Sequence, residues 1–571
     1  MSAWAHFALV ALASGAEPAV SPLTTHPRYT GSPFVRTWMA EDYGASPVNT
    51  RVVQHPRTGC IYVSNERGVL EFDGVRWRLI PTPNQQIVTG LSVDGRGRIW
   101  GGGRSALFRL EPDARGELQA RSMLDRLPAN LRTGISVGDC VATAQGVFFR
   151  ETRNLIFFGL DDGPARVWPA TEGNAVTLSL WQIADEPYVN LGRGVVLRLR
   201  NDRLEPVPSI ASRVLDTRAT PEGAYQVLAP ASLDRWDGTR RTVVHSPLGK
   251  DFAQNATFLA DGRMVFATLN SGLIVCDREG RFLQKIDRTN GLPANNVNHV
   301  FEDREGGVWA ALRYGIARVQ LDSPYALHGP AQGREGTTLS LALSGGELFV
   351  AGTENAVRRR ANGQFRPVQE ARGPDREVIA HADRVYFLGL RLRSLRPALG
   401  NETTELEVRN YYGLVPVTTA PGWFAHGSNE GLRWAHFTGE KWVSEGPLKT
   451  RLGSATAVLE APASVIWCAN LGVAWRIDFR AGLRADAPTQ RFSLAEGLPS
   501  PLAGMFLLGR EVVAAGGANS CASTKPRGAL SPRHASRSSK VFRSSARTAA
   551  RAAPSGSRAD RPPARSGGSR P

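Results

Sequence analysis

The sequence predicts an all-β fold of tandem β-propellers, in which the first is seven-bladed, the second is incomplete and a disordered basic tail follows. Three observations support this prediction. A strand pair recurs about every forty residues, which is the period of a four-stranded propeller blade. Turn-forming residues separate the strands. The apolar residues alternate or form short runs, and they lack the i, i+3, i+4, i+7 spacing of helical repeats.

An aromatic residue opens the second half of each unit and marks its position. Successive marks are 37 to 48 residues apart. They are Tyr62, Trp100, Phe148, Tyr188, Tyr225, Phe266, Trp309, Phe349, Tyr386, Phe424 and Trp467. A chain of 571 residues with 42% hydrophobic side chains is long enough for two large domains.

The turns between strands begin with Asp and contain Gly. They begin at Asp94, Asp261 and Asp303. An Asp side chain accepts local backbone N–H bonds, and Gly supplies the positive φ that a tight hairpin needs. Trp100 and Trp309 follow their Asp at the same offset, so we expect both to pack between blades.

The N-terminal residues resemble an export signal. Phe7 to Ala16 is a ten-residue run of apolar and small residues, and Ser14 and Ala16 suit signal peptidase. We therefore expect a signal peptide over residues 1–16 and a periplasmic location. No later run approaches the roughly 18 apolar residues needed to cross a bilayer.

Seven units fit a seven-bladed propeller over residues 17–325. Phe34 to Trp38 could supply an added strand that closes this ring. The stretch from Leu321 to Glu335 contains Ser-Pro and Gly-Pro steps, which are loop signals, and we interpret it as a joint. Residues 326–517 then form a second propeller of about four and a half blades. Since this ring cannot close normally, we expect exposed blade edges.

The tail, residues 518–571, is rich in Arg, Ser and Pro. It holds 12 basic residues and one acid, whereas the first 517 residues hold 57 basic and 51 acidic residues. The net charge of +17 therefore comes mainly from the tail. A nucleic-acid-binding arm is disfavoured, because Phe542 is its one aromatic residue for base stacking. The change falls inside a repeat, after Gly509 to Gly516, so we interpret the tail as disordered, out-of-frame translation that the coding nucleotide sequence would test.

Residues suited to catalysis are scattered along the chain. The sequence has no HExxH or GxSxG motif and no Cys/His cluster at metal spacing. Cys60, Cys276 and Cys468 lie within or beside predicted strands, where free Cys behaves as a small apolar residue. Gly101 to Gly103 follows a strand and predicts a tight turn. We expect no catalytic, cofactor-binding or metal-binding residues and no cofactor, and we leave the ligand-binding residues unassigned.

Three further groups have a structural and a functional interpretation. His299 lies in a strand-like segment, where a structural role is favoured over a catalytic one. Asp161 and Asp162 lie in a Gly-rich loop, which favours a solvated turn. Tyr411 and Tyr412 could stack on a sugar, but a connection between blades explains them equally well.

Gly291 to Gln320, GLPANNVNHVFEDREGGVWAALRYGIARVQ, is similar to the repeat of the two-component regulator propeller family. That repeat has Gly-Leu-Pro, a polar stretch with Asn and Val, a strand, Asp-x-x-Gly, and then Trp and a Gly-hydrophobic strand. Gly497 to Ser500 repeats the opening, and Ile61 to Ile80 resembles the family's first blade. The resemblance covers about residues 30–517. It is loose around Phe148 and Tyr225, which lack the Asp-x-x-Gly turn.

The resemblance implies an extracytoplasmic input region that senses a ligand, often a carbohydrate fragment. In the family, two seven-bladed propellers precede a β-sandwich, one membrane span and a cytoplasmic output such as a histidine kinase or diguanylate cyclase. None of those later parts is recognisable here. We expect a small-molecule or oligosaccharide ligand, no enzyme activity, no nucleic acid partner and membrane contact only through a missing downstream segment. A homodimer stays open.

Two alternatives remain, because propellers serve many functions and the fold alone does not decide among them. One is an interaction scaffold, and the other is a propeller glycosidase or lyase. In the sensor interpretation, the ligand binds at one mouth of the first propeller, where loops from all blades converge on a central channel.

Overall fold

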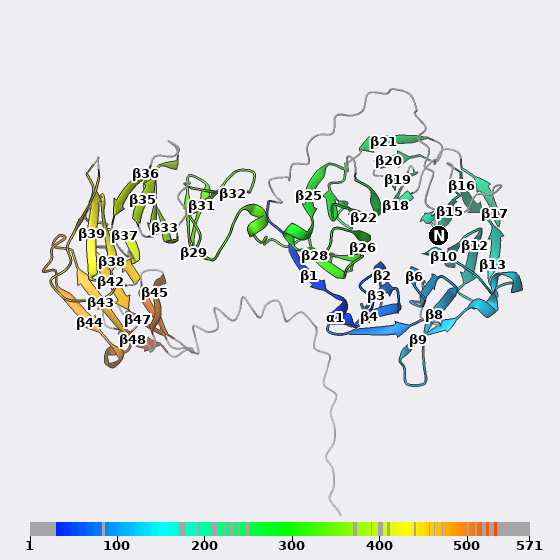
Figure 1. Ribbon diagram of the computed structural model, residues 1–571, viewed down its shortest axis with the longest axis horizontal. Coiled ribbons are helices and arrows are strands. Elements are labelled where there is room, and N and C mark those ends of the chain that lie inside the picture. Colours follow the sequence, from blue (N-terminus) through cyan, green and yellow to red (C-terminus); the bar gives the residue numbers. More distant parts are fainter. Residues whose placement is uncertain are drawn as a thin grey trace, which may run out of the picture. The chain divides into compact units, whose positions relative to one another are not determined.

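The computed structural model describes residues 30–533, in two compact units (Figure 1). Within this span it leaves out residues 83–85, 171–176, 192–194, 208–213, 222, 229–231, 238–239, 246–250, 369–373, 390, 398–402, 408–411, 439–440, 456, 462, 471, 499–501, 509–510, 517–520 and 525–529. Unit 1 comprises residues 1–334 and 361–364, and unit 2 comprises residues 335–360 and 365–571. The predicted signal peptide and the tail from residue 534 lie outside the described residues.

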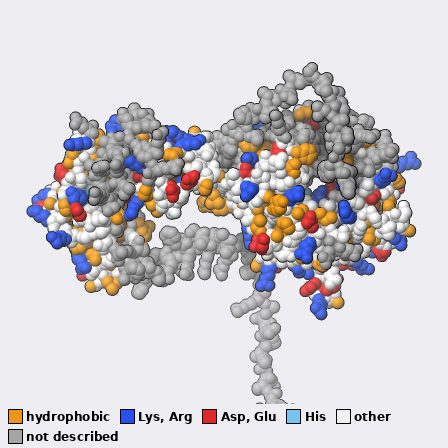
Figure 2. Space-filling model, in the orientation of Figure 1, with side chains coloured by type: hydrophobic (Ala, Val, Ile, Leu, Met, Phe, Trp, Pro, Cys, Tyr) orange, Lys and Arg blue, Asp and Glu red, His pale blue; other side chains and the backbone are white. Residues whose placement is uncertain are grey.

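The all-β prediction is confirmed, since the described residues form twelve four-stranded antiparallel sheets. The one described α-helix is short, α1 (Ala40–Tyr43). The described 3-10 turns are η3 (Leu124–Arg126), η4 (Ala129–Leu131), η5 (Arg288–Asn290), η6 (Pro330–Gln332) and η8 (Leu494–Glu496). Acidic and basic side chains are interspersed over the surface of both units, as expected of solvated blade faces (Figure 2).

Unit 1 contains seven sheets, and each sheet is one blade. Six blades use four consecutive strands. The first three are β2 (Asn49–Gln54), β3 (Ile61–Asn65), β4 (Gly68–Phe72) and β5 (Trp77–Pro81); β6 (Val88–Val93), β7 (Ile99–Gly103), β8 (Ala106–Pro112) and β9 (Leu118–Ser122); and β10 (Val137–Thr143), β11 (Gly146–Glu151), β12 (Asn154–Gly159) and β13 (Arg166–Pro169). The next three are β14 (Ser179–Ile183), β15 (Glu186–Asn190), β16 (Val196–Arg200) and β17 (Arg203–Pro206); β18 (Val214–Thr220), β19 (Gly223–Leu228), β20 (Ser232–Trp236) and β21 (Arg241–His245); and β22 (Ala253–Phe258), β23 (Met264–Thr268), β24 (Leu273–Cys276) and β25 (Phe282–Ile286).

The seventh blade closes the ring of unit 1. It joins β26 (Val297–Glu302), β27 (Gly307–Leu312) and β28 (Ile316–Gln320) to β1 (Phe34–Trp38), which runs antiparallel to β28. The added strand expected at residues 34–38 is therefore confirmed. Trp38 of β1 stacks on Trp309 of the seventh blade, with ring centroids 5.1 Å apart, and meets Phe72 of the first blade edge-on at 5.2 Å. Each inner strand also contacts the next one around the ring, and β26 contacts β2.

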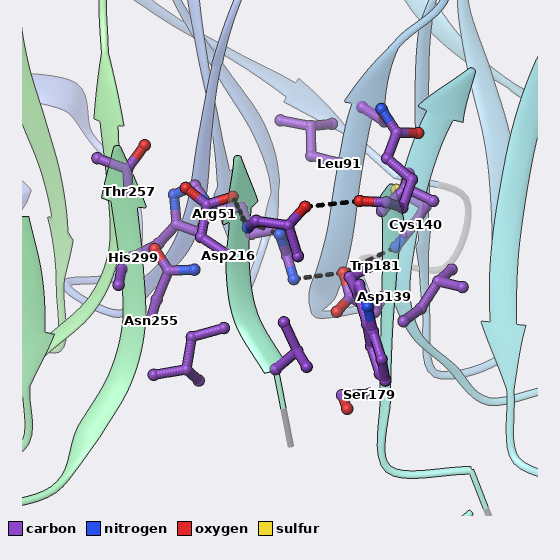
Figure 3. Close-up of a pocket in the computed structure, with 18 of the residues that line it drawn as sticks. Arg51, Leu91, Asp139, Cys140, Ser179, Trp181, Asp216, Asn255, Thr257 and His299 are labelled. Atoms are coloured by element: carbon purple, nitrogen blue, oxygen red, sulfur yellow. Dashed lines mark hydrogen bonds and ion pairs between the residues drawn. The ribbon is translucent and has the colours of Figure 1, made fainter. Parts of the chain in front are cut away.

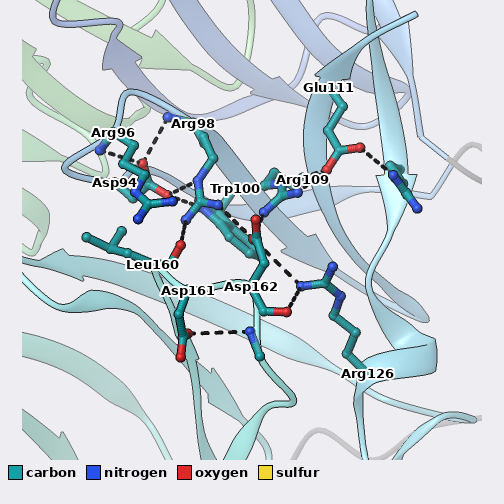
Figure 4. Close-up of polar contacts among 12 residues, drawn as sticks. Asp94, Arg96, Arg98, Trp100, Arg109, Glu111, Arg126, Leu160, Asp161 and Asp162 are labelled. Carbon is teal, nitrogen blue, oxygen red and sulfur yellow. Dashed lines mark hydrogen bonds and ion pairs between the residues drawn. The ribbon is translucent and has the colours of Figure 1, made fainter.

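Asp and Trp cooperate in two of the turns of unit 1. The Asp94 carboxylate accepts from the Trp100 indole N–H at 2.8 Å and from the backbone N–H groups of Arg96 and Arg98 at 2.9 and 3.0 Å (Figure 4). Although burial opposes it, the Trp100 and Arg98 bonds hold the pKa of Asp94 below its usual value. The Asp94 carboxylate thus fixes both its own turn and the side chain of Trp100.

Asp303 repeats this arrangement, whereas Asp261 does not. The Asp303 carboxylate accepts from Trp309 Nε1 at 2.8 Å and from the N–H of Gly307 at 2.8 Å. In the turn around Asp261, the residue in the position of Asp94 is Leu259, whose N–H donates to the Arg263 carbonyl. The Asp261 turn therefore resembles the Asp94 and Asp303 turns in sequence, but its Asp lies two residues later in the hairpin.

Two smaller expectations were wrong. Gly101 to Gly103 lies inside β7 and forms no turn. An added Cβ at Gly101 would lie 2.3 Å from the Phe108 ring, and one at Gly102 would lie 2.5 Å from Val137. These glycines admit close packing. Asp162 is not merely a solvated turn residue, because its carboxylate accepts from Arg98 at 2.7 Å and also bonds Arg109 (Figure 4). It links the third blade to the second.

Unit 2 contains five sheets. Their strands are β29 (Thr338–Ser344), β30 (Glu347–Gly352), β31 (Val357–Arg359) and β32 (Phe365–Pro367); β33 (Asp375–His381), β34 (Arg384–Gly389), β35 (Arg391–Leu395) and β36 (Thr403–Glu407); β37 (Tyr412–Pro416), β38 (Trp423–Ser428), β39 (Gly431–Phe437) and β40 (Trp442–Glu445); β41 (Ala457–Glu460), β42 (Val465–Asn470), β43 (Val473–Asp478) and β44 (Thr489–Phe492); and β45 (Leu502–Leu508), β46 (Glu511–Gly516), β47 (Cys521–Thr524) and β48 (Leu530–Arg533).

The last blade extends past the predicted end of the repeat. We expected the strand pattern to stop at residue 517, but β47 pairs with β46 and β48 pairs with β47. Strand pairing uses backbone groups, and β48 pairs even across Pro532, so the weak side-chain pattern there did not predict these strands. Unit 2 therefore has five four-stranded sheets instead of four and a half.

Unit 1 extends into the joint between the repeats, past the predicted boundary at residue 325. Ser32 and Leu327 exchange two backbone hydrogen bonds of 2.8 Å, and the Gln332 side chain donates to the Ser32 hydroxyl at 3.0 Å. These contacts explain why unit 1 runs to Arg334 rather than to residue 325.

Candidate functional site

The inner strands of unit 1 surround a cavity of about 620 Å³. Its lining residues come from all seven inner strands, β2, β6, β10, β14, β18, β22 and β26. A volume in this range is typical of small-molecule sites, which measure roughly 300–1,000 Å³. The cavity is therefore the candidate functional site of the described residues.

A β-bulge sets which residues line the cavity. Six of the inner strands carry a bulge near their start, where one extra residue interrupts the pairing. Three extra residues bind the next blade: the hydroxyls of Thr50 and Thr89 donate to the carbonyls of Val88 and Val137 at 2.7 and 2.6 Å, and the Asn298 amide donates to the Asn49 carbonyl at 2.7 Å. The bulges thus join neighbouring blades around the channel.

The residue after the bulge occupies a corresponding register position on each of these strands. Five of these residues line the cavity, Arg51, Asp139, Asp216, Asn255 and His299, and the sixth is Gly90. The strand without a bulge, β14, begins with Ser179, which lines the same cavity. The side chains from these separate blades lie around one space (Figure 3).

Arg51 spans the cavity. Its guanidinium forms an ion pair with Asp139, which lies two blades further along the ring. The strand between them, β6, has Gly90 at this register position, which has no side chain to obstruct the pair. On its other side, Arg51 Nη1 lies 3.4 Å from Nε2 of His299. Arg51 therefore joins the first, third and seventh blades.

His299 lies half-buried beside this guanidinium. Burial, together with the charge of Arg51, holds the pKa of His299 well below its usual value. Its Nδ1 lies 3.4 Å from the Val52 backbone N–H, which donates toward it. The expected structural role agrees with these contacts, but the ring also lines the cavity.

Asp216 is the second acid of the cavity and is half-buried. Its two carboxylate oxygens accept from the N–H groups of Thr217 and Phe258 at 2.8 and 2.9 Å. Burial nevertheless raises its pKa to about 6, because the charged form is poorly solvated. The next ring residue, Asn255, accepts from the Val300 N–H at 3.0 Å.

Strand β14 differs from the others, because three of its polar side-chain atoms have no hydrogen-bond partner in the described structure. They are Ser179 Oγ, Trp181 Nε1 and Gln182 Oε1. Ser179 and Trp181 are only 5% and 4% exposed. Buried polar groups are normally paired, so these atoms indicate places for ordered water.

The sequence analysis assigned no ligand-binding residue, and the cavity supplies the missing candidates. One signal was available: each ring residue lies 9 to 11 positions before the aromatic mark of its repeat. The inner strand precedes that aromatic across a hairpin, so its first polar residues were identifiable in principle. Tyr411 lies outside the described residues, and Tyr412 lies in β37 of unit 2.

Two searches of the described residues found nothing further. No group of three or more His, Cys, Asp and Glu side chains is arranged to hold a metal ion. No helix in that part of the chain has the length and apolar character to cross a membrane.

Solved structures similar to this chain are β-propeller proteins. One, described as the extracellular domain of a hybrid two component system, BT3049 from B. thetaiotaomicron, is 12% identical with a TM-score of 0.65, over 88% of this chain and 72% of that chain. A second, described likewise for BT4673 from B. thetaiotaomicron, is 13% identical with a TM-score of 0.42, over 88% and 78%. A streptogramin B lyase is 13% identical with a TM-score of 0.42, over 51% and 98%.

No model of a known protein family matches the chain, and no curated protein matches it. At the identities above, similarity shows the fold alone. The chain is therefore an all-β protein whose four-stranded sheets are arranged as in these β-propellers.

Proposed function

We propose that this chain is the extracytoplasmic, ligand-sensing input region of a two-component-type signalling protein. The ligand, a carbohydrate or a similar small molecule, binds in the central cavity of unit 1. We include in the proposal membership of the two-component regulator propeller family, on the motif at Gly291 to Gln320. We assign no output domain and no nucleic acid partner to these residues.

One observation carries the proposal. Seven blades converge on a polar cavity of about 620 Å³. The similarity to the extracellular domain described for BT3049 supports it, because that fold is described as part of a two component system. A ligand held by several inner strands would change the packing between blades. Such a change could transmit the binding signal to a downstream partner.

Binding is tested on the full chain by thermal shift with a panel of oligosaccharides, followed by hydrogen exchange. We expect at least one sugar to raise the melting temperature and to protect the peptides that contain β2, β14 and β18. Unit 2 is the internal control, since its peptides should exchange at an unchanged rate. A panel without any stabilising sugar contradicts the proposal and favours a scaffold, while turnover of a sugar favours a glycosidase or lyase.

Export is a separate part of the proposal. It rests on the apolar run from Phe7 to Ala16. Expression in a Gram-negative host should yield periplasmic protein whose N-terminal residue is Glu17. Retention in the cytoplasm with residues 1–16 intact would contradict it.

A further inference from the structure

A second cleft of unit 1 lies between the seventh and first blades, where the ring closes. It measures about 460 Å³, which is within the range of small-ligand sites. Alternate residues of β1 line it, together with the β2–β3 turn of the first blade and the β26–β27 turn of the seventh. None of its lining residues also lines the central cavity, so the cleft is a separate place on the molecule.

The boundary between the second and third blades shows what binds at such a place. In the second blade, Trp100 pairs across the hairpin with Arg109. Asp162, from the β12–β13 turn of the third blade, accepts from Arg98 at 2.7 Å and also bonds Arg109 (Figure 4). A carboxylate from the next blade therefore occupies that boundary.

In the cleft between the seventh and first blades, the carboxylates are bound within their own blades. Trp309 and Arg318 pair across β27 and β28 as the Trp and Arg of the second blade do. Arg318 donates to Asp303 and Glu305 of its own blade, at 2.7 and 3.2 Å. The β4–β5 turn of the first blade supplies Asp73, whose carboxylate accepts from two N–H groups of that turn, each at 2.7 Å.

Two guanidinium groups of this cleft are left without an acidic partner. The guanidinium carbon of Arg36, on β1, lies 4.7 Å from the centroid of the Trp38 ring. Arg304 reaches from the seventh blade to the first, where Gly59 has no side chain and leaves room for its guanidinium. Among the described residues, neither arginine forms an ion pair. Guanidinium groups bind carboxylates through charge-assisted hydrogen bonds in a matching geometry, so the pair favours a carboxylate ligand.

We infer that this cleft binds a carboxylate that stands next to an apolar group, as at the C terminus of a peptide that ends in an aromatic residue. Arg36 and Arg304 bind the carboxylate, in the role that arginines of the second blade have toward Asp162. Phe34 lines the same cleft and is 40% exposed, so it offers apolar surface to the neighbouring side chain of the ligand. The site is independent of the central cavity and of the proposed function.

Calorimetry on the full chain tests the inference with N-acetylated Gly-Ser-Phe, either as the free acid or with an amidated C terminus. We expect the acid to bind about tenfold more tightly than the amide, and Arg36→Gln or Arg304→Gln to weaken the acid about tenfold. The matched control is Arg57→Gln. It removes an exposed positive charge outside the cleft, from a side chain that donates to the Arg96 carbonyl at 3.2 Å, and should leave affinity unchanged.

A third probe, 3-phenylpropionate, identifies the source of the carboxylate. Tighter binding of the peptide supports recognition of a chain terminus, and equal binding of the two acids supports the site and assigns it to free aromatic acids. If neither acid binds, or if the amide binds as tightly as the acid, the inference is overturned, and this comparison needs no variant. Unchanged affinity in both arginine variants, with the melting temperature of the parent chain, overturns it as well. None of these outcomes bears on sugar binding in the central cavity.

Discussion

Val52 in unit 1 and Leu341 in unit 2 occupy the same place in their blades. Each follows the bulge of the first inner strand of its unit, β2 or β29. Val52 is 0% exposed and packs with Trp309 and Ile316 of the seventh blade, whereas Leu341 is 60% exposed. An apolar strand face is thus encoded in both units, but only a closed ring covers it.

The other inner strands support this comparison. The corresponding residues Leu91, Cys140, Val300 and Val378 are all buried, at 2%, 3%, 2% and 2% exposure, in clusters with the preceding blade. The first blade of unit 2 has no preceding blade in the described structure. Its Leu339 and Leu343 are therefore also exposed, at 49% and 70%.

The other end of unit 2 is also uncovered. On β45, Met505 packs in a cluster with Trp467 of the fourth blade, whereas Phe506 and Leu508 are 45% and 57% exposed. Leu507, on the same face as Met505, is 46% exposed as well, so the outer end of β45 is uncovered on both faces. Exposed apolar faces at both ends agree with the expected blade edges and indicate a tendency to associate.

The largest contrast should come from a buried charge at these matched positions. Val52→Glu places an unpaired carboxylate inside unit 1 and should lower the free energy of unfolding by roughly 5 kcal/mol. Leu341→Glu lies in solvent, should change it by less than about 0.5 kcal/mol, and should reduce aggregation. Urea unfolding and light scattering measure both effects. Equal destabilisation by the two variants would contradict an open blade edge.

Removing the closing Trp should affect unit 1 alone. Trp38→Ala removes contacts with Trp309, Phe72 and Trp77, so we expect a loss of about 4 kcal/mol in the unfolding transition of unit 1. Its control is Trp442→Ala, which removes a buried Trp of unit 2. Calorimetry should show each variant shifting a different transition. If both shift one shared transition, the units are not independent.

The Asp–Trp turn should make part of the stability of unit 1 depend on pH. Asp303→Ala removes the partner of Trp309, Gly307 and Arg318, and should cost roughly 3 kcal/mol at pH 7. These bonds hold the pKa of Asp303 low against the effect of burial. The stabilisation is therefore present above the unfolded pKa of about 3.9 and lost as the pH falls below it.

A pH series tests this prediction by comparison with unit 2. The Trp467 N–H donates there to the Ala461 carbonyl at 2.9 Å, which does not titrate. The penalty of Asp303→Ala should shrink toward pH 2, whereas the penalty of Trp467→Phe should stay constant. A penalty of Asp303→Ala that is independent of pH would show that the carboxylate is not the stabilising form.

The smallest predicted effect concerns half-buried acids with raised pKa values, one in each unit. Burial raises the pKa of Asp216 to about 6 and that of Glu377 to about 7. For a raised pKa, stability is fully present below the unfolded pKa and falls as the pH rises through the folded pKa. For Asp216 the fall amounts to roughly 2–3 kcal/mol between about pH 4 and 6.

Two substitutions, one in each unit, should separate these two pH-dependent losses of stability. Asp216→Asn should remove a decline from the unit 1 transition between pH 4 and 6, and Glu377→Gln should remove one from unit 2 that extends to about pH 7. Chemical unfolding at successive pH values measures the differences from the parent chain. Identical pH profiles for parent and variant would refute the raised pKa at that site.

Several local features could be predicted from the sequence, because their causes are local. The pairing of strands within a blade depends on alternation and on turn residues, and the Asp94 and Asp303 turns place their Trp residues as expected. Other features depend on contacts between blades. Asp162 binds arginines of another blade, and the glycines at 101–103 make room for Phe108 and Val137.

The candidate site was the least predictable part. Arg51 and His299 are 248 residues apart in the chain but 3.4 Å apart across the channel. A bulge that adds one residue to a strand decides which side chain faces the cavity, and no single residue type marks a bulge. The aromatic marks also do not all occupy the same register position. Phe266 pairs with Ala256, the second residue after its bulge, whereas Trp309 pairs with Phe301, the third residue after its bulge.

The sequence by itself determined the blade, its period, its turns and its apolar faces, because hydrogen bonds and side-chain alternation within a hairpin involve residues close in the chain. The tertiary structure alone decided which blade faces are covered, that the bulges line the channel, and which polar atoms remain unpaired. Those properties depend on the closure of seven blades around one axis, which brings together residues that no local pattern connects.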